Sequence, residues 1–229
     1  MRTLSSFILA GGMIGAGALI AVGLTFFHSD NRYVTVKGLA EKTVEANQAT
    51  WQLRFSVSSN SLPQLYQNIA KAQKEISSFL KHQGFKAQHI HFDTVAVTDN
   101  DANQYSNRKP ESRYSANASV SLLTNQVRRV SQAVQTTGEL VQQGVIITNS
   151  NTRYRYTKLN QIKPTMLTLA TENAQKAAQT FAKNSHSHLN GIRHASQGLF
   201  SISSADGSYG QNEIMKTVRV VATVQYFIH

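Results

Sequence analysis

Cysteine is missing from this 229-residue chain, and carboxylates are scarce. Without thiols the protein has no disulfides and no lipid-modified cysteine, and zinc ribbons, iron–sulfur clusters and cysteine nucleophiles are excluded. Only 12 Asp and Glu accompany 23 Lys and Arg, which gives a formal net charge of +11. Asp99 and Asp101 fall in a polar stretch without periodicity, where a pair of catalytic carboxylates would be poorly pre-organised.

Motifs of the common enzyme classes are missing too. There is no G-x-S-x-G elbow for a serine nucleophile, and glycines cluster only in the first apolar run, so no phosphate-binding loop is visible. Histidine pairs occur at His89-x-His91, on a predicted strand, and at His186-x-His188, in a predicted turn with His194 nearby. No acidic residue or further histidine has the spacing to complete a metal site at either pair. We therefore expect no enzymatic activity, no bound metal and no cofactor.

The first apolar run, residues 7–27, has no charge, and Thr25 is its one weakly polar side chain. At about 1.5 Å per residue, a helix of this length reaches roughly 30 Å, which is the thickness of the hydrocarbon core of a bilayer. The run predicts a membrane-spanning helix. Arg2 before the run places the N-terminus in the cytoplasm by the positive-inside rule, so the rest of the chain is exported, in a bacterium to the periplasm.

An alternative is that the run is a secretory signal, with Ala16-Gly17-Ala18 as its small-x-small cleavage site. The apolar run continues well past Ala18, which favours an uncleaved anchor in the inner membrane. We accordingly divide the chain into a cytoplasmic tip with its anchor, residues 1–30, and an exported body, residues 31–229. Within the span, Gly11 and Gly15, and Gly12 and Ala16, place small residues one turn apart, a spacing that lets two membrane helices pack closely.

The positive charge of the body predicts attraction to anions such as acidic lipid headgroups or acidic envelope polymers, although a general role in solubility is the alternative. The basic residues are dispersed, with Arg128-Arg129 as one of few adjacent pairs. Proteins that track phosphates usually concentrate their charge and interleave it with aromatic residues, so we do not expect nucleic-acid binding.

Hydrophobic periodicity predicts the elements of the body. Alternation predicts strands over residues 33–40, 43–58, 88–98, 113–124, 145–158, from 191 onward and over 217–228. Stripes at spacings of three and four predict helices from Ser61 to Gly84, from Thr124 or Asn125 to Gln143, and from near Pro164 to Ala182. Polar loops are expected over residues 99–111 and 204–212.

The first two strands should form an antiparallel hairpin, with a turn at Glu41-Lys42 and a bulge near Asn47-Gln48, where the alternation changes parity. The order β-β-α-β-β-α-β-α-β-β predicts the α+β class, with helices on one face of a mainly antiparallel sheet. Residues 43–158 alone have the βαββαβ order of a split βαβ sandwich.

A stretch of alternating aromatic and basic residues, Arg153-Tyr154-Arg155-Tyr156, is the best candidate for a binding strand. Alternation places both tyrosines on one face and both arginines on the other. The arrangement is typical of a sheet with a buried aromatic face and a solvated cationic face. The functional alternative is that Arg153 and Arg155, with Arg128 and Arg129, contact an anion or a partner.

The opening VTVKGLAEKTVEANQATWQLRFSV, residues 34–57, resembles the start of SIMPL-domain proteins, with a V-x-V-x-G strand, a turn and a long alternating strand. The stretch ATENAQKAAQTFAKNSHSHLNGIRHASQG, residues 170–198, is similar to the family's alanine-rich helix and the strand after it. The resemblance covers residues 33–228. It implies a bacterial envelope protein linked to stress tolerance, without established catalytic residues, some of whose relatives form large hollow homo-oligomers.

Two functional hypotheses follow. The first is a non-enzymatic, membrane-anchored envelope protein that self-associates through its small-residue span and through the edges of strands 33–40 and 217–228. The second is a binding module for an anionic envelope ligand, either an acidic lipid or a polymer.

Overall fold

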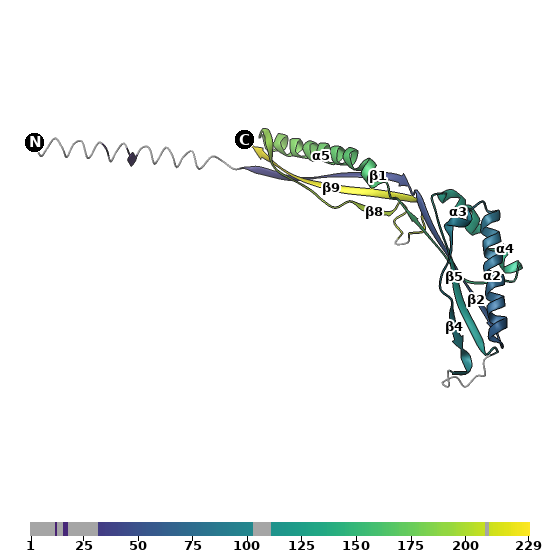
Figure 1. Cartoon of the computed structure of the whole chain (residues 1–229). Coiled ribbons are helices and arrows are strands. Elements are labelled where there is room, and N and C mark those ends of the chain that lie inside the picture. The colour runs from purple at the N-terminus through teal and green to yellow at the C-terminus, as the bar shows by residue number, and fades with distance from the viewer. Residues whose placement is uncertain (1–11, 13–15, 18–31, 103–110, 209–210) are drawn as a thin grey trace, which may run out of the picture. The chain divides into compact units, whose positions relative to one another are not determined.

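A computed structural model of the protein describes residues 12, 16–17, 32–102, 111–208 and 211–229 (Figure 1). The predicted span over residues 7–27, with Gly11 and Gly15, lies outside the described residues, apart from Gly12, Ala16 and Gly17, which are helical and exposed. Among the residues that are described, no helix is long and apolar enough to cross a membrane. The predicted anchor and the boundary at residue 30 therefore stay predictions.

The body has the mixed α+β composition that was predicted, but its strands form two sheets and not the single sheet that was expected. Its strands are β1 (Tyr33–Glu45), β2 (Gln48–Ser59), β3 (Ile90–Phe92), β4 (Ala96–Asp99), β5 (Tyr114–Thr124), β6 (Ile146–Arg155), β7 (Leu189–Gln197), β8 (Ser201–Ser204) and β9 (Met215–Ile228). Its helices are α2 (Leu62–His82), α3 (Val127–Gln135), α4 (Gly138–Gln142) and α5 (Leu159–Asn184), with short 3-10 turns η1 (Ala87–His89) and η2 (Asn100–Ala102).

The described residues fall into two compact units. The first unit contains residues up to 40, residues 165–199 and residues 220–229, and the second unit contains residues 41–164 and 200–219. The strands β1 and β9 contribute residues to both units.

The five-stranded sheet of the second unit has the order β3-β5-β2-β6, with β4 also on β5, and its paired strands are antiparallel. The helix α2 connects β2 to β3, and β5 lies between these two strands in the sheet. The helices α3 and α4 connect β5 to β6, and β2 lies between those two strands. Each of these connections is a split βαβ unit, which confirms the prediction for residues 43–158.

The core of the second unit lies between this sheet and its helices, on the face that Figure 1 shows covered by α2 and α3. Alternate residues of β2, Trp51, Leu53 and Phe55, are at most 1% exposed. Burying a side chain of this size contributes about 1.5–3 kcal/mol. The indole nitrogen of Trp51 donates to Ser150 Oγ at 3.0 Å, and the ring meets Phe79 edge-on with centroids 6.3 Å apart.

The other sheet has the order β1-β9-β7, with β8 also on β9. β7 and β8 run antiparallel to β9. The Ile228 amide donates to the Arg32 carbonyl, and the Ala46 amide donates to the Ile214 carbonyl. Because these bonds join opposite ends of the two strands, β1 is antiparallel to β9 as well.

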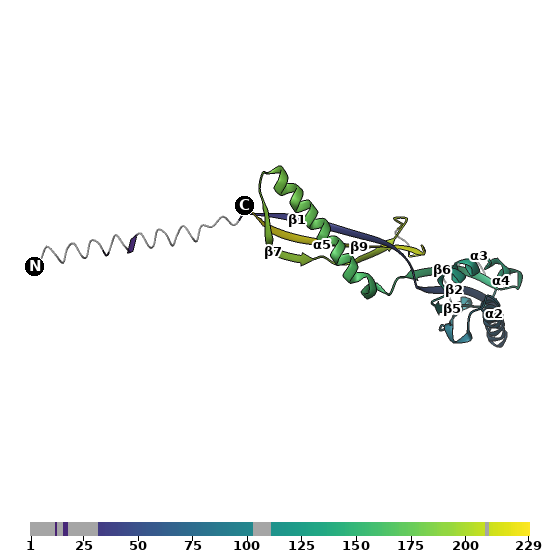
Figure 2. The same cartoon turned by 90° about the horizontal axis from the view of Figure 1, so that it is seen from above.

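In the first unit, α5 lies along β1 and β9, as the two views in Figures 1 and 2 agree. Its buried residues recur every fourth position and form one stripe, namely Met166, Ala170, Ala174, Ala178 and Ala182. The small alanine side chains allow close approach, and the stripe packs against alternate buried residues of β9, which include Val224 and Tyr226.

The predicted hairpin of the first two strands is wrong. β1 continues through Glu41-Lys42 to Glu45, and the turn lies at Ala46-Asn47, where a bulge was predicted. The Asn47 side chain fixes this turn, because its amide donates to Thr157 Oγ1 at 2.8 Å and its oxygen accepts from the Thr157 amide at 2.7 Å. The change of parity thus marks the point where the chain leaves one sheet for the other.

Several other boundaries differ from the predictions. β6 ends at Arg155 and not at residue 158, and the strand predicted from residue 191 begins at Leu189 and is divided into β7 and β8. The predicted helix to Gln143 is divided into α3 and α4, because the Thr136 and Thr137 hydroxyls donate to carbonyls of the preceding turn. The last helix begins at Leu159, so Pro164 lies inside it. The strand from residue 88 is divided into β3 and β4 near the predicted change of parity.

The prediction that residues 217–228 form an edge strand is also wrong. β9 is paired on both sides, so its backbone N–H and C=O groups bond to β1 on one side and to β7 and β8 on the other, whereas β1 is an edge of the sheet as predicted.

Candidate functional site

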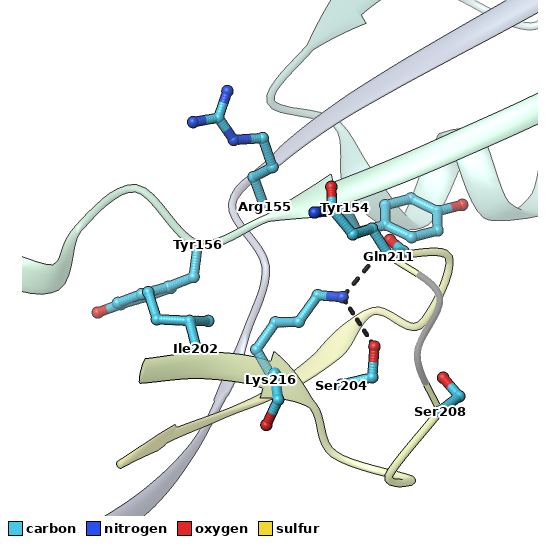
Figure 3. A pocket seen from close by; sticks show the side chains of 9 residues that line it. Tyr154, Arg155, Tyr156, Ile202, Ser204, Ser208, Gln211 and Lys216 are labelled. Carbon is cyan, nitrogen blue, oxygen red and sulfur yellow. Dashed lines mark hydrogen bonds between the residues drawn. The ribbon is translucent and has the colours of Figure 1, made fainter. Parts of the chain in front are cut away.

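A pocket of about 390 Å³ lies in the second unit, between the end of β6 and the hairpin of β8 and β9 (Figure 3). The pocket combines tyrosine rings and an isoleucine with hydroxyls and one amine. Its lining residues are Tyr154, Arg155, Tyr156, Ile202, Ser203, Ser204, Ser208, Gln211 and Lys216.

The β6 side of the pocket follows the predicted alternation. Tyr154 is buried and Tyr156 is half-buried, whereas Arg153 and Arg155 are exposed. Figure 3 shows the Arg155 guanidinium directed away from Lys216. Burial raises the pKa of the Tyr154 hydroxyl, although hydrogen bonds to Ser131 and Thr152 partly offset this effect. The Tyr154 hydroxyl is therefore a neutral group at neutral pH.

Lys216 of β9 is the charged group inside the site, and its residue is 4% exposed. Its Nζ donates to Ser204 Oγ at 3.3 Å and to the Gln211 carbonyl at 3.4 Å, so both acceptors are neutral and both bonds are long (Figure 3). No carboxylate of the described residues lies within ion-pair distance of this Nζ. Burial lowers the pKa of the Lys216 ammonium, and the charges of Glu213 and Asp206 oppose this shift.

Our sequence reasoning missed Lys216 because it began the last strand at Thr217. The alternation itself contains the signal, since positions 216, 218 and 220 share one face, and Val218 and Val220 are buried on it. An amine at this parity is on the covered side of the sheet.

The histidine pairs lie elsewhere in the structure. His89 ends η1, and His91 on β3 is opposite Ser121. His186 follows α5 with a φ of 51°, and the backbone of His188 exchanges two hydrogen bonds with His229. Within the described ranges, no group of three or more His, Cys, Asp or Glu is arranged to hold a metal ion.

The face of the five-stranded sheet opposite its helices is polar, and we call it the open sheet face. Gln48 is paired with Arg155 and Thr50 with Arg153, so these two arginines share a face with Arg54, which has the same parity as Thr50. No hydrogen bond or ion pair to the described residues holds any of the three guanidinium groups.

A carboxylate, Asp93, also lies at the open sheet face, where serine hydroxyls donate hydrogen bonds to it. Its Oδ2 accepts from Ser119 Oγ at 2.5 Å and from Ser121 Oγ at 2.9 Å. These bonds, led by that from Ser119, lower the pKa of Asp93. Among the described residues, no ion pair joins Asp93 to the arginines of this face.

The other two predicted contact residues lie on α3, apart from the arginines of β6. Arg128 forms a two-pronged ion pair with Glu45, with Nε–Oε1 and Nη2–Oε2 distances of 2.7 and 2.8 Å. Arg129 donates to the Gly84 carbonyl and to Gln126 Oε1. Both side chains already have partners within the chain, so an anion would have to compete for them.

The first unit exposes large apolar side chains. Leu199 is 95% exposed, Phe181 60% and Ile192 54%, and Tyr33 and Leu169 are also exposed. β1 and β7 are the outer strands of their sheet, and neither is paired with a further strand of the described chain on its outer side. Apolar surface and free strand edges thus occur together in the first unit; in the second unit the edge strand β6 also exposes an apolar residue, Ile146.

The sequence model of the family SIMPL, described as a protein of unknown function (DUF541), matches residues 34–226. The match includes residues of both compact units. A comparison with curated proteins found no match.

Proposed function

The chain belongs to the SIMPL family, and from this membership we propose that it is a non-enzymatic, membrane-anchored envelope protein whose exported body assembles into a homo-oligomer with a role in envelope maintenance or stress. The observation that carries the proposal is the first unit, which combines two free strand edges with exposed apolar side chains.

A free edge presents unpaired backbone N–H and C=O groups to solvent, and natural proteins usually cover or interrupt such edges. In β7 the residues from Asn190 to Gln197 are all exposed, and its register on β9 becomes regular only from His194. β1, at the opposite edge, is 13 residues long. Pairing β1 of one copy with β7 of the next is a head-to-tail contact, and a contact of this type closes into a ring or continues as a filament.

The exposed apolar side chains of the first unit favour a surface that is covered by another copy when the protein assembles. Leu199 follows β7, Ile192 lies on it, and Phe181 lies on α5. Anchoring by residues 7–27 would hold the bodies in one membrane plane, where their effective concentration is high and weak contacts suffice.

The test is the mass of the full-length protein extracted in mild detergent, measured by light scattering with correction for the detergent. We expect a defined multiple of 25.3 kDa. The double variant Ile192→Asn/Leu199→Asn should shift the distribution toward the monomer, because it removes apolar surface at the proposed contact without opening the core.

Val141→Asn is the matched control, since Val141 is 60% exposed but lies on α4 of the second unit. It should leave the particle mass unchanged. A wild-type protein that is strictly monomeric in detergent rejects the proposal.

A second candidate function is binding of an anionic envelope ligand, an acidic lipid or polymer, and the open sheet face favours it. Arg54, Arg153 and Arg155 form no ion pair there among the described residues. Affinity for anionic vesicles or an acidic polymer should fall steeply when salt rises from about 0.1 to about 1 M, where the Debye length shrinks from about 10 to about 3 Å.

Arg153→Gln/Arg155→Gln should weaken this binding, whereas Arg128→Gln should not, because Glu45 already neutralises Arg128. This candidate is ruled out if the affinity does not change with salt, or if Arg153→Gln/Arg155→Gln and Arg128→Gln weaken binding equally.

A further inference from the structure

Lys216 has no role in assembly or in the open sheet face, yet it is the amine that lines the pocket of the second unit. We propose that Lys216 is a nucleophilic amine that forms a Schiff base with a small polar aldehyde or ketone bound in this pocket.

The geometry gives the amine a fixed position beside a space that accepts a ligand. Hydrogen bonds to Ser204 Oγ and the Gln211 carbonyl hold Nζ between β8 and the loop before β9 (Figure 3). The pocket volume of about 390 Å³ is in the range of small-molecule sites. Tyr156 and Ile202 offer apolar contact, and the serine hydroxyls offer hydrogen bonds to a polar carbonyl compound.

The electrostatics suit a neutral reactant and a cationic product. A free ammonium is not nucleophilic, and burial without an ion pair favours the neutral amine. Asp206 and Glu213 act on Lys216 through space, Tyr154 is held neutral, and Arg155 is directed away. An anionic ligand would meet the field of the two carboxylates, whereas the same field stabilises an iminium ion.

The chemistry is balanced without an oxidant or a reductant. The lone pair of the neutral Nζ attacks the carbonyl carbon, a C–N bond forms, and the C=O π electrons move to oxygen. A proton passes from nitrogen to that oxygen, which gives a carbinolamine. A proton from solvent joins the carbinolamine oxygen, the nitrogen lone pair forms the C=N bond, and the oxygen leaves as water, which gives an iminium ion. Loss of the N–H proton to solvent then gives the neutral imine. Amine and carbonyl compound become imine and water, and hydrolysis reverses the reaction.

The experiment labels the full-length protein in mild detergent with limiting glycolaldehyde and cyanoborohydride, which reduces an imine to a stable amine. Peptide mass mapping then gives the labelling rate at each lysine. At neutral pH we expect Lys216 to be labelled faster than the exposed Lys163, because a lysine whose pKa is lowered has a larger fraction of free amine. This advantage should disappear as the pH approaches 10.5, the ordinary value for lysine.

Lys216→Met should abolish the fast phase, and Lys163→Met should preserve it. If Lys216→Met does not fold, the site-resolved map of the wild-type protein still decides the question. Labelling of Lys216 that is equal to or slower than that of the exposed lysines at neutral pH overturns the proposal, and so does complete protection of Lys216.

Discussion

Gly38 of β1 lies directly against the backbone of α5. A Cβ at this position would overlap the Ala170 carbonyl oxygen and the Ala174 amide nitrogen, and it would lie 2.9 Å from Ala174 Cβ. These neighbours are helix backbone and cannot move aside as a flexible side chain would. A single hydrogen atom in place of a side chain therefore sets how closely helix and sheet approach in the first unit.

Gly38→Ala should destabilise the protein by about 1–3 kcal/mol, the cost of overpacking a close-packed interface, as measured by denaturant unfolding. Gly191→Ala is the matched control, because Gly191 is also a strand glycine of the first unit but has nothing within 4 Å of its Cβ position. Equal stability of the two variants would contradict the tight contact.

Lys216 also determines a pH dependence of stability. Its folded pKa lies below the ordinary 10.5, so between these two values the unfolded chain binds more protons and the unfolding free energy rises with pH. Below the folded pKa both states are protonated, and the burial cost is present in full.

Lys216→Met removes this dependence. The gain in unfolding free energy of Lys216→Met over the wild type should be larger near neutral pH and should shrink as the pH rises toward 10.5. Denaturant unfolding at several pH values measures this difference. Lys176→Met, which removes an exposed lysine of α5, is the control. Parallel stability curves for the wild type and Lys216→Met would show that Lys216 is not desolvated.

At the scale of elements, each sheet has one strand that organises it. β2 is paired with β5 on one side and with β6 on the other, and β9 is paired with β1 on one side and with β7 and β8 on the other. Both strands bury alternate side chains under helices. The other strands of this sheet, β1, β7 and β8, are each paired with β9 on one side only.

Amide hydrogen exchange should follow this order. Amides of β9 should exchange most slowly within their sheet, and those of β7 should exchange faster, because β7 is paired on one side only. If copies pair through their edges, mass spectrometry should show that β7 and β1 become protected in the wild-type particle relative to Ile192→Asn/Leu199→Asn. Unchanged protection of both edges would indicate that assembly uses another surface.

At the scale of the whole molecule, the family match joins two compact units that each have their own helices and sheet residues. The formal charge of +11 is a property of the chain as a whole. Its effect depends on placement, since Arg128 is neutralised locally whereas the arginines of the open sheet face are not. Net charge alone therefore does not identify a binding surface.

The membrane anchor gives a prediction at this scale. The intact mass of the membrane-extracted protein should include residues 1–18, because the apolar run continues past Ala18 and favours retention. Protease added outside the inner membrane should digest the body, as an exported domain requires. A mature chain that begins near residue 19 would indicate a removed signal and would end the argument from tethering.

The sequence by itself determined the α+β class, the split βαβ order of residues 43–158 and the opposite faces of Tyr154 and Arg155. These features follow from local periodicity, because side-chain direction alternates along a strand whatever the strand is paired with. The stripe of α5 was visible for the same reason, since a helix repeats on its own.

Only the tertiary structure decided which strands are paired and where the chain changes sheet. The turn at Asn47 depends on Thr157, which is 110 residues away, and no local pattern contains that contact. The same holds for the partners of Arg128 and Lys216. Pairing, burial and desolvation are set by residues distant in sequence, so the pocket around Lys216 appeared only when β6, β8 and β9 were brought together.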